Sequence, residues 1–280
     1  MNTRALTPLP DRLDQWDVIL VNTSAGKDSL VMLDTVCAAA AAAGVLDRVV
    51  VVHADLGRAE WKGTRELAGR QASRYGVRFE VVVRSDGADL LEYIERRGSW
   101  PSSSARYCTS DLKRAPIRRM MTRLADERRE AGVVGRPVRI LNCMGLRAAE
   151  SSARAKKSPF ELDGGASTKG TRTVWNWLPV FDWSDDDVWG HIRAGGLEYH
   201  PAYDLDGVTR LSCVMCVLAG GEQLAAGVRH NPVLAVTYVA MERRMGHLFK
   251  HRQSIESVVD EVLGVEVPVE VRRRMFAAAA

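Results

Sequence analysis

The chain has 280 residues, of which 46% are hydrophobic and 26% are charged, and it carries a formal net charge of +4. This length can bury one core, or one core with a small extension, without the help of disulfides. No apolar run approaches the roughly 20 residues that a membrane-spanning helix requires, and the start MNTRALTPLP lacks the apolar stretch of a secretion signal, so we expect a cytoplasmic protein without a membrane partner.

Short β-branched runs alternate with stretches of helix formers in the first part of the chain. The runs predict strands at residues 16–22, 48–53 and 79–83, and the stretches between them predict helices at 30–43 and 61–75. The run at 48–53 is apolar almost throughout, as expected of a strand that is covered on both faces. This alternation predicts a doubly wound parallel α/β sheet with ligands at the carboxyl ends of its strands.

The following part of the chain predicts a basic helix at 113–131 and a fourth core strand at 138–144. Residues 158–171 are rich in glycine and serine, which is typical of a mobile loop that could close over a site. Helices are expected again from about Asn231 onward. These features predict that a small extension of loops and helices follows the α/β domain.

The net charge is unevenly distributed along the chain. Between Arg96 and Lys157 there are 16 Lys and Arg residues against 5 Asp and Glu residues, a local charge of +11 that leaves −7 for the remainder. An anionic partner would explain this segment. The solvated face of the basic helix would explain it equally well, because acidic and basic residues alternate there.

A loop with the sequence Ser24-Ala25-Gly26-Lys27-Asp28-Ser29 lies between the first predicted strand and the first predicted helix. Backbone N–H groups at such a position, together with the start of the helix, favour bound anions. Lys27 would add a positive charge, Ser24 and Ser29 would donate hydrogen bonds, and Asp28 would hold Mg²⁺ or cap the helix. The loop fits neither a Walker loop nor a dinucleotide fingerprint, so we expect a phosphate site of another kind.

This loop resembles the S-x-G-x-D-S loop of PP-loop ATP pyrophosphatases, and four later stretches resemble the phosphoadenosine phosphosulfate (PAPS) reductase family. These stretches are VVHADLG at 51–57, R-x-C-x-x-x-x-K-x-x-P at 106–116, G-x-R-x-x-E-S-x-x-R at 145–154 and P-V-F-D-W-S-D-D-D-V-W at 179–189. The resemblance implies a Rossmann-like fold of the adenine nucleotide alpha hydrolase type. We expect the ATP-binding domain to span 1–200 and the extension with the C-x-x-C loop to span 201–280.

The resemblance also implies that the chain binds ATP and Mg²⁺ and breaks ATP between its α- and β-phosphates. Within the quoted stretches it implies that His53 and Asp55 border the adenosine. It further implies that Gly145, Arg147 and Arg154 contribute to nucleotide binding, together with the residues of the loop at 24–29.

We expect Lys27, Asp28 and Arg147 to be catalytic, because charge develops on the α-phosphate and on the departing pyrophosphate. A guanidinium group offers paired donors to phosphate oxygens, which favours such a role for Arg147 and Arg154. Arg154 lies four residues after Glu150, so an ion pair between these two side chains is the alternative for Arg154.

Three cysteines form a second constellation. Cys213 and Cys216 have the two-residue spacing that lets both sulfurs face one metal. The resembling reductases of adenylyl sulfate bind a [4Fe–4S] cluster through such a pair and two adjacent cysteines at the position of Cys108. Tyr107 stands where one of those cysteines would be, so a cluster needs Cys143, an outside ligand or an open iron to which sulfur could bind. Zn²⁺ and a metal-free pair are the alternatives.

The last ten residues, VRRRMFAAAA, contain no cysteine, whereas the resembling assimilatory reductases use a C-terminal cysteine that attacks sulfur. The chain resembles the ATP pyrophosphatase component of DNA phosphorothioation systems. We therefore expect it to activate a substrate for sulfur transfer, with DNA and a cysteine desulfurase or other sulfur-donor protein as partners, in an oligomer or alone. A sulfonucleotide reductase of sulfate assimilation is one alternative, and a non-catalytic nucleotide-binding subunit is another.

Overall fold

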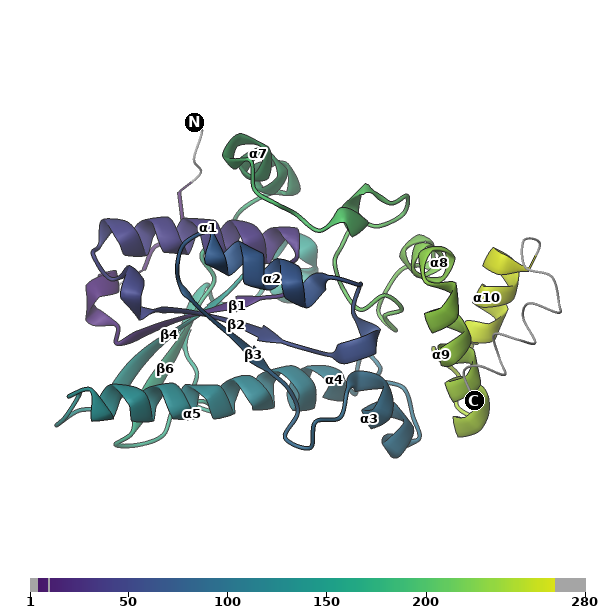
Figure 1. Cartoon of the computed structure of the whole chain (residues 1–280), viewed down its shortest axis with the longest axis horizontal. Coiled ribbons are helices and arrows are strands. Elements are labelled where there is room, and N and C mark those ends of the chain that lie inside the picture. The colour runs from purple at the N-terminus through teal and green to yellow at the C-terminus, as the bar shows by residue number, and fades with distance from the viewer. Residues whose placement is uncertain (1–4, 10, 265–280) are drawn as a thin grey trace. The chain divides into compact units, whose positions relative to one another are not determined.

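Six strands form one sheet in the order β3-β2-β1-β4-β6-β5 (Figure 1). The computed structural model that shows this sheet describes residues 5–9 and 11–264. The strands span Val18–Thr23 (β1), Val49–Ala54 (β2), Arg78–Val82 (β3), Val138–Met144 (β4), Phe160–Leu162 (β5) and Arg172–Trp177 (β6). All neighbours are parallel except β5 and β6. The chain builds outward from β1 to β3 and then restarts beside β1 with β4, which confirms the predicted doubly wound sheet and places its switch point between β1 and β4.

The two faces of the sheet carry separate hydrophobic cores, because successive residues of a strand point to opposite faces. In β1, Ile19 belongs to one core and Leu20 to the other. The first core includes residues of α1 (Lys27–Ala42) and α7 (Asp185–Gly195), and the second includes residues of α5 (Ala115–Glu130). In Figure 1, α1 and α5 accordingly lie on opposite sides of the strands. β1 and β2 are therefore buried on both faces, as their nearly continuous apolar runs predict.

Most helix boundaries lie within a few residues of the predicted ones. α1 begins at Lys27 rather than at Leu30, because the backbone enters the helix directly after the extended residue Gly26. The shorter helices of the same part of the chain are α2 (Thr64–Ser73), α6 (Ser152–Ala155) and 3₁₀ turns at Leu13–Gln15, Leu46–Arg48 and Ala148–Glu150. None of the described helices is both long and apolar enough to cross a membrane.

The segment 158–171, predicted to be a mobile loop, is instead held by hydrogen bonds to its neighbours. β5 pairs with β6, the N–H of Ala166 donates to Oδ1 of Asp163 at 2.9 Å, and Nε of Arg172 donates to the carbonyl of Ala166 at 2.7 Å. The prediction was wrong because the same small and polar residues also suit an edge strand and a turn. The edge strand β5 is stabilised by β6, which lies outside the segment, so the local sequence pattern does not reveal this pairing.

A second compact unit is formed by the described residues of 55–62, 83–114 and 201–280, apart from the sheet-bearing unit of 1–54, 63–82 and 115–200. In this division the segments 55–62 and 83–114, which were expected to belong to the domain 1–200, join the C-terminal part. Its helices are α3 (Leu90–Arg97), α4 (Tyr107–Thr109), a π-helical turn at Ser110–Arg114, α8 (Gly221–His230), α9 (Pro232–Met245), α10 (Ile255–Leu263) and 3₁₀ turns at Gly57–Ala59 and Pro201–Asp204.

Aromatic rings form the centre of this second unit. Trp100 stacks on Tyr238 and meets the edge of Phe249, with ring centroids 5.2 Å apart in both pairs. Helical structure begins earlier than the expected Asn231, because α8 starts at Gly221. Two adjacent glycines at 220 and 221 suggest a loop, but here they open a helix whose inner face packs against the aromatic core.

Asp17, which directly precedes β1, ties this strand to β4. Its carboxylate accepts two hydrogen bonds from Arg136, at 2.6 and 2.8 Å, and one from the N–H of Arg139 at 2.8 Å. Burial opposes its ionisation, but these bonds outweigh burial and hold the pKa of Asp17 below its usual value. We expect Asp17→Asn to lower the free energy of unfolding by about 1–3 kcal/mol at neutral pH, measured by urea denaturation.

The pH dependence of this loss follows from the sign of the shift. A lowered pKa adds stability above about pH 4 that is lost as the pH falls through the folded-state value, so wild type and Asp17→Asn should converge in acid. Asp14→Asn is the matched control, because Asp14 pairs with Arg12 where both side chains are exposed, at 36% and 81%. An equal loss in the control, or a difference that does not change with pH, would contradict this interpretation.

Candidate functional site

The loop between β1 and α1 forms a tight turn whose own side chains organise it. Ala25 has a φ of 56°, in the left-handed region, and its N–H donates to Oγ1 of Thr23 at 3.1 Å. The hydroxyl of Ser29 accepts from the N–H of Ser24 at 3.2 Å and donates to the carbonyl of Gly26 at 2.9 Å. Gly26 is the N-cap of α1 and makes no side-chain cap, so the first turn of the helix presents its backbone N–H groups to an anion.

Gly145, expected to take part in nucleotide binding, lies against this loop at the end of β4. A Cβ atom at this position would come within 2.9 Å of the backbone carbonyl group of Asp28 and 3.0 Å of Cα of Ser29. Glycine therefore allows the chain after β4 to approach the first turn of α1 closely. This contact positions the segment that carries Arg147.

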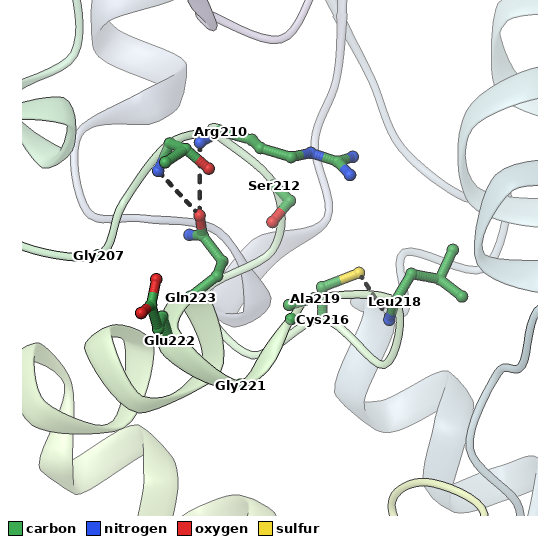
Figure 2. Close-up of a pocket in the computed structure, with 11 residues that line it drawn as sticks. Gly207, Arg210, Ser212, Cys216, Leu218, Ala219, Gly221, Glu222 and Gln223 are labelled. Atoms are coloured by element: carbon green, nitrogen blue, oxygen red, sulfur yellow. Dashed lines mark hydrogen bonds between the residues drawn. The ribbon is translucent and has the colours of Figure 1, made fainter. Parts of the chain in front are cut away.

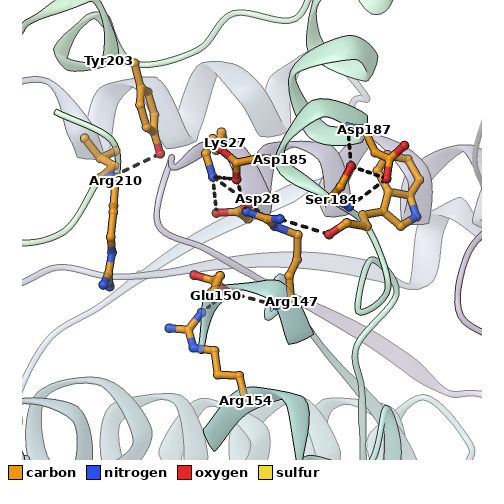
Figure 3. Close-up of polar contacts among 12 residues, drawn as sticks. Lys27, Asp28, Arg147, Glu150, Arg154, Ser184, Asp185, Asp187, Tyr203 and Arg210 are labelled. Atoms are coloured by element: carbon orange, nitrogen blue, oxygen red, sulfur yellow. Dashed lines mark hydrogen bonds and ion pairs between the residues drawn. The ribbon is translucent and has the colours of Figure 1, made fainter. Parts of the chain in front are cut away.

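Four charged side chains meet at the start of α1, and Figure 3 shows how they converge. Nζ of Lys27 contacts both carboxylate oxygens of Asp28 at 3.2 Å and Oδ1 of Asp185 at 3.0 Å. Nε of Arg147 donates to Oδ1 of Asp28 at 2.6 Å, and a terminal nitrogen of Arg147 pairs with Asp185. Lys27 and Arg147 are only 4% and 2% exposed. The sheet-bearing unit thus brings together the three residues that the sequence predicts to be catalytic and adds Asp185.

The two cations and two carboxylates of this charge cluster neutralise one another. Burial disfavours the charge of Arg147, but the carboxylates of Asp28 and Asp185 outweigh burial and raise its pKa. Burial likewise opposes ionisation of Asp185, but Lys27 and Arg147 outweigh it and lower its pKa. The cations and carboxylates of the cluster therefore balance one another, and a polyphosphate could replace the carboxylates as the partner of Lys27 and Arg147.

Asp185 was missed as a site residue by the sequence analysis, although it lies within the quoted stretch at 179–189. It is the first residue of α7, whose N-cap Ser184 forms a capping box with Asp187. The carbonyl of Trp183 accepts a hydrogen bond from Arg147 at 3.0 Å. The signal that could have identified Asp185 is the run of three aspartates after the N-cap, of which the capping box uses only the third.

Arg154, predicted to bind nucleotide, forms an ion pair with Glu150. The same carboxylate accepts the backbone N–H of Arg147 at 3.0 Å. The structure therefore contains the ion pair between Arg154 and Glu150 that was the alternative to nucleotide binding. Through Glu150, Arg154 supports the backbone of Arg147, one step away from the charge cluster.

His53 and Asp55, both expected to border the adenosine, lie at and just after the carboxyl end of β2. His53 is 1% exposed, and its Nδ1 lies 3.2 Å from the carbonyl of Thr23 at the end of β1. Asp55 belongs to the second unit, where its carboxylate accepts the N–H of Gly57 at 2.7 Å and closes a turn. His53 therefore lies at the strand ends that flank the loop.

A row of three asparagines, which the sequence analysis did not identify, crosses the sheet from β1 to β6. Nδ2 of Asn22 donates to Oδ1 of Asn142, and Nδ2 of Asn142 donates to Oδ1 of Asn176, both at 2.7 Å. Nδ2 of Asn22 also donates to the carbonyl of Cys143 at 2.8 Å. Asn142 is buried and the other two are half-buried, and linked amides of this kind help to fix the register of β1, β4 and β6.

The predicted metal ligands Cys108, Cys213 and Cys216 all lie in the second unit. Among the described residues the three sulfurs do not all lie within 4.8 Å of one another, whereas sulfurs on one zinc ion are about 3.8 Å apart. Cys213 is half-buried, and desolvation raises the pKa of its thiol to about 12, with smaller effects from Lys113, Glu60 and both other cysteines.

Cys143, considered as a fourth ligand, does not suit that role. It lies in the middle of β4, is fully buried in the apolar core between the sheet and α1, and belongs to the sheet-bearing unit. Burial raises its pKa well above the usual value of a thiol. A metal ligand must be deprotonated and accessible to the metal. Cys143 is therefore left out of the ligand set, which then consists of the three cysteines of the second unit.

At least seven of the 16 basic residues between Arg96 and Lys157 form ion pairs with acidic side chains. In α5, Arg118 pairs with Asp163 at 3.1 Å and Arg123 with Glu80 at 2.8 Å. Further arginines of the segment, each paired with an acidic residue, are Arg96, Arg136, Arg139, Arg147 and Arg154. These ion pairs account for much of the positive charge without a polyanionic partner.

Known proteins resemble the chain over most of its length. Residues 18–219 match the family described as the phosphoadenosine phosphosulfate reductase domain. An uncharacterized 37.8 kDa protein of Escherichia phage 186 is 27% identical over 159 residues, which are 57% of this chain and 44% of that protein. Adenosine 5'-phosphosulfate reductase of Neisseria meningitidis serogroup A is 28% identical over 141 residues, which are 50% of each chain. The chain thus spans half or less of the length of these curated relatives.

Among solved structures, a phosphoadenylyl-sulfate (PAPS) reductase from Candida auris, determined as a phosphate complex, superimposes with a TM-score of 0.46. The match has 18% sequence identity and covers 69% of this chain and 79% of that one.

Proposed function

Because the chain belongs to the phosphoadenosine phosphosulfate reductase domain family, we propose that it cleaves ATP between the α- and β-phosphates and so activates a substrate for sulfur transfer. Proteins of this family and its superfamily bind nucleotides and transfer or reduce sulfur. The proposal assigns the triphosphate to the loop at 24–29 and the departing pyrophosphate to the charge cluster of Lys27, Asp28, Arg147 and Asp185.

The charge cluster is the observation that carries this proposal. Two buried cations, Lys27 and Arg147, lie at the carboxyl end of the central strand, where ligands of doubly wound sheets bind. They adjoin the uncapped first turn of α1, whose N–H groups favour a phosphate. A purely structural ion pair needs only one cation and one carboxylate. Two cations and two carboxylates around an anion-binding turn suit a site where the phosphates of a ligand replace the carboxylates as partners of the cations.

Cleavage between the α- and β-phosphates leaves negative charge on pyrophosphate and on the α-phosphate oxygens. Nζ of Lys27 and the fork of Arg147 can meet that charge once they exchange Asp28 for phosphate oxygens, and the bond from Arg147 to the carbonyl of Trp183 can persist during this exchange. The guanidinium presents two parallel donors and the ammonium a single point charge, so their tasks differ. We assign Arg147 to a pair of phosphate oxygens and Lys27 to the bond that breaks.

Mg²⁺ suits the donor set of the same cluster. Asp28 and Asp185 both reach Nζ of Lys27, at 3.2 and 3.0 Å, so their carboxylates border one small region. Mg²⁺ prefers oxygen ligands and is commonly bound by one or two carboxylates together with phosphate oxygens. When Lys27 and Arg147 turn to phosphates, Asp28 and Asp185 would be free to hold the ion, which neutralises charge on the pyrophosphate.

The sulfur acceptor that we propose is the backbone of DNA, in line with the resemblance to phosphorothioation components. Activation would place the adenylyl group on a phosphate oxygen, which sulfur then replaces, with a cysteine desulfurase or other donor protein supplying the sulfur. The segment from Arg96 to Lys157 also holds exposed basic residues outside the ion pairs named above, among them Arg106, Lys156 and Lys157, which could meet such a polymer. DNA contact must therefore involve groups outside those pairs.

We also propose that Cys108, Cys213 and Cys216 hold a [4Fe–4S] cluster. The three residues belong to one unit, and Cys108 and Cys213 pack against the same apolar core. The two-residue spacing of Cys213 and Cys216 lets both sulfurs face one metal site. With three cysteine ligands, such a cluster would supply one iron at which a sulfur atom can bind.

Purification without oxygen should give a brown protein with a broad absorbance near about 400 nm if this assignment is right. Cys108→Ala, Cys213→Ala and Cys216→Ala should each remove most of the colour, and Cys143→Ala should keep it, because Cys143 lies in the core of the sheet. Iron and zinc analysis of the same samples provides the second measurement. A colourless wild-type protein with one bound zinc would replace the cluster by the zinc alternative.

The experiment that tests the proposed function measures pyrophosphate and AMP release from ATP with Mg²⁺, with and without DNA and a sulfide source. The expected result is pyrophosphate release that DNA increases. A protein that releases no pyrophosphate under any of these conditions would contradict the proposal and favour a nucleotide-binding subunit.

Sulfonucleotide reduction is the second candidate, and the identity of 28% with an adenosine 5'-phosphosulfate reductase over half of each chain favours it. The same cations would then bind a sulfonucleotide in place of ATP. Release of sulfite from adenylyl sulfate or its 3′-phosphorylated form, with no pyrophosphate from ATP, would assign the chain to this reaction.

A further inference from the structure

A cavity of about 340 Å³ lies in the second unit, beside the loop at 207–219 and the start of α8. Figure 2 shows that Gln223 reaches from α8 to this loop, where its Oε1 accepts the N–H groups of Thr209 and Arg210 at 3.0 and 3.4 Å. Cys216, one of the proposed cluster ligands, also lines the cavity. The cavity therefore adjoins the cluster site, whereas a separate group of polar side chains lies in the sheet-bearing unit.

In the sheet-bearing unit, three segments meet at the carboxylate of Asp34 in α1. Its Oδ2 lies 2.6 Å from Nε2 of His191 in α7, and its Oδ1 accepts the hydroxyl of Tyr75, just after α2, at 2.5 Å. The side chains of Asp34 and His191 are only 25% and 15% exposed. Burial and the bond to Asp34 raise the pKa of Tyr75, so its hydroxyl keeps the proton and stays a donor. Both oxygens of this carboxylate are thus engaged.

The contact between His191 and Asp34 is a second point at which α7 meets α1. At the N-terminal ends of the two helices, Oδ1 of Asp185 lies 3.0 Å from Nζ of Lys27. The second contact lies seven residues further along α1 and six residues further along α7, which is about 9–10 Å along each helix. These two contacts together determine where the start of α7 lies on α1.

Apolar packing alone would fix α7 less exactly. Val188 and Ile192 bury the inner face of the helix against the core that it shares with α1. Such burial is not directional, so it tolerates small shifts and rotations of a helix, whereas a hydrogen bond weakens steeply when its geometry changes. The bond from His191 to Asp34 therefore adds the precision that the packing lacks.

His191 also supports Arg147 through Trp183. The indole of Trp183 lies edge-on to the imidazole, with ring centroids 5.4 Å apart and ring planes at 62°. Trp183 is 2% exposed, and its backbone carbonyl accepts a hydrogen bond from Arg147 at 3.0 Å. The imidazole thus contacts two supports of the charge cluster, one through α7 to Asp185 and one through Trp183 to Arg147.

We propose that His191 is a positioning residue of the charge cluster. Its bond to Asp34 fixes the start of α7, so that the carboxylate of Asp185 reaches Mg²⁺ beside the phosphates. Asp185 depends on this support because 60% of its side chain is exposed, so burial does little to hold it. A displacement of about 1 Å is enough to impair such a site. The inference rests on the proposed function, in which Asp185 is a ligand of the ion.

Binding of Mn²⁺ to the full chain with the α,β-methylene analogue of ATP tests this inference. Mn²⁺ takes the same oxygen ligands as Mg²⁺, and the signal of free Mn²⁺ in electron paramagnetic resonance falls as the ion binds. His191→Leu removes the bond to Asp34 and should weaken Mn²⁺ binding roughly 10-fold, as expected when a group that supports a metal ligand is lost. His191→Gln keeps an N–H donor at nearly the place of Nε2 and should restore most of the affinity.

Tyr75→Phe is the matched control, because it removes the other hydrogen bond to the same carboxylate, from the side of α2 rather than of α7. Thermal unfolding should show similar losses of stability in Tyr75→Phe and His191→Leu. Mn²⁺ binding should weaken only in His191→Leu, which separates a positioning role from a purely structural one.

Weaker Mn²⁺ binding in His191→Leu that His191→Gln recovers and Tyr75→Phe does not share supports the inference. Unchanged binding in His191→Leu, an equal loss in Tyr75→Phe, no recovery in His191→Gln, or a wild type that binds no Mn²⁺ with the analogue would overturn it. Pyrophosphate release from ATP separates this inference from the proposed function. Mn²⁺ binding that depends on His191, without pyrophosphate release, contradicts only the proposed function. Release together with unchanged Mn²⁺ binding in His191→Leu contradicts only the inference.

Discussion

Replacing Lys27 by alanine should lower the rate of ATP cleavage by about 100- to 1,000-fold while the chain stays folded. Lys27 is the buried point charge nearest the uncapped turn of α1, so its loss removes stabilisation of charge that appears only as pyrophosphate departs. Folding should persist because Asp28 and Asp185 both keep their contacts with Arg147. Pyrophosphate release under saturating ATP and Mg²⁺, together with a thermal unfolding curve, provides the measurement.

Two further variants control this result. Lys169→Ala removes an exposed lysine of the same unit and should leave the rate unchanged. Lys27→Arg keeps the charge in a larger, planar group and should recover only part of the rate. If Lys27→Ala cleaved ATP as fast as wild type, Lys27 would be a structural ion-pair partner, and its role at the phosphates would be wrong.

Asp28→Asn and Asp185→Asn should each raise the Mg²⁺ concentration needed for half-maximal cleavage by roughly 10- to 100-fold, the usual effect of disturbing a metal site. Binding of ATP without Mg²⁺ should not weaken in either variant, because each substitution removes a carboxylate that competes with phosphate for Lys27 and Arg147. Titrations of the rate with Mg²⁺ and of ATP binding without it separate these two effects.

Asp186→Asn is the matched control for this pair, since Asp186 is the neighbour of Asp185 in the first turn of α7, is exposed as Asp185 is, and does not belong to the charge cluster. Lys27 and Arg147 hold the pKa of Asp185 below its usual value despite burial, so its charge is complete near neutrality. The Mg²⁺ requirement should therefore be the same at about pH 6 and pH 8. Weaker ATP binding without Mg²⁺ in Asp185→Asn would contradict the assignment of its carboxylate to the ion.

The sequence predicted the centre of the sheet well because its strands are covered on both faces. The runs that form β1, β2 and β4 consist mostly of apolar residues, a pattern typical of parallel strands that are covered on both faces. The edge pair β5 and β6 was not predicted, because an edge strand depends on a partner that its own residues do not reveal. The sequence also did not predict that the segments 55–62 and 83–114 belong to the same unit as the C-terminal part, because contacts between segments far apart in the chain leave no local sequence pattern.

The candidate site likewise contains residues that the sequence could predict and residues that it could not. Lys27, Asp28 and Arg147 could be predicted, because a glycine turn before a helix and a family motif both point to them. Asp185 could not be separated from its neighbours Asp186 and Asp187 without knowing which face of α7 meets α1. The contact between His191 and Asp34 could not be predicted either, since it joins side chains that are 157 residues apart in the chain.

The position of bond cleavage tests the central claim most directly. The protein is given two ATP analogues with Mg²⁺, DNA and a sulfide source, one with a methylene group between the α- and β-phosphates and one with it between the β- and γ-phosphates. We expect the second analogue to yield AMP and methylenediphosphonate and the first to bind through Lys27 and Arg147 without being cleaved. Release of inorganic phosphate from the first analogue, with the second left intact, would show that the loop at 24–29 serves a different reaction.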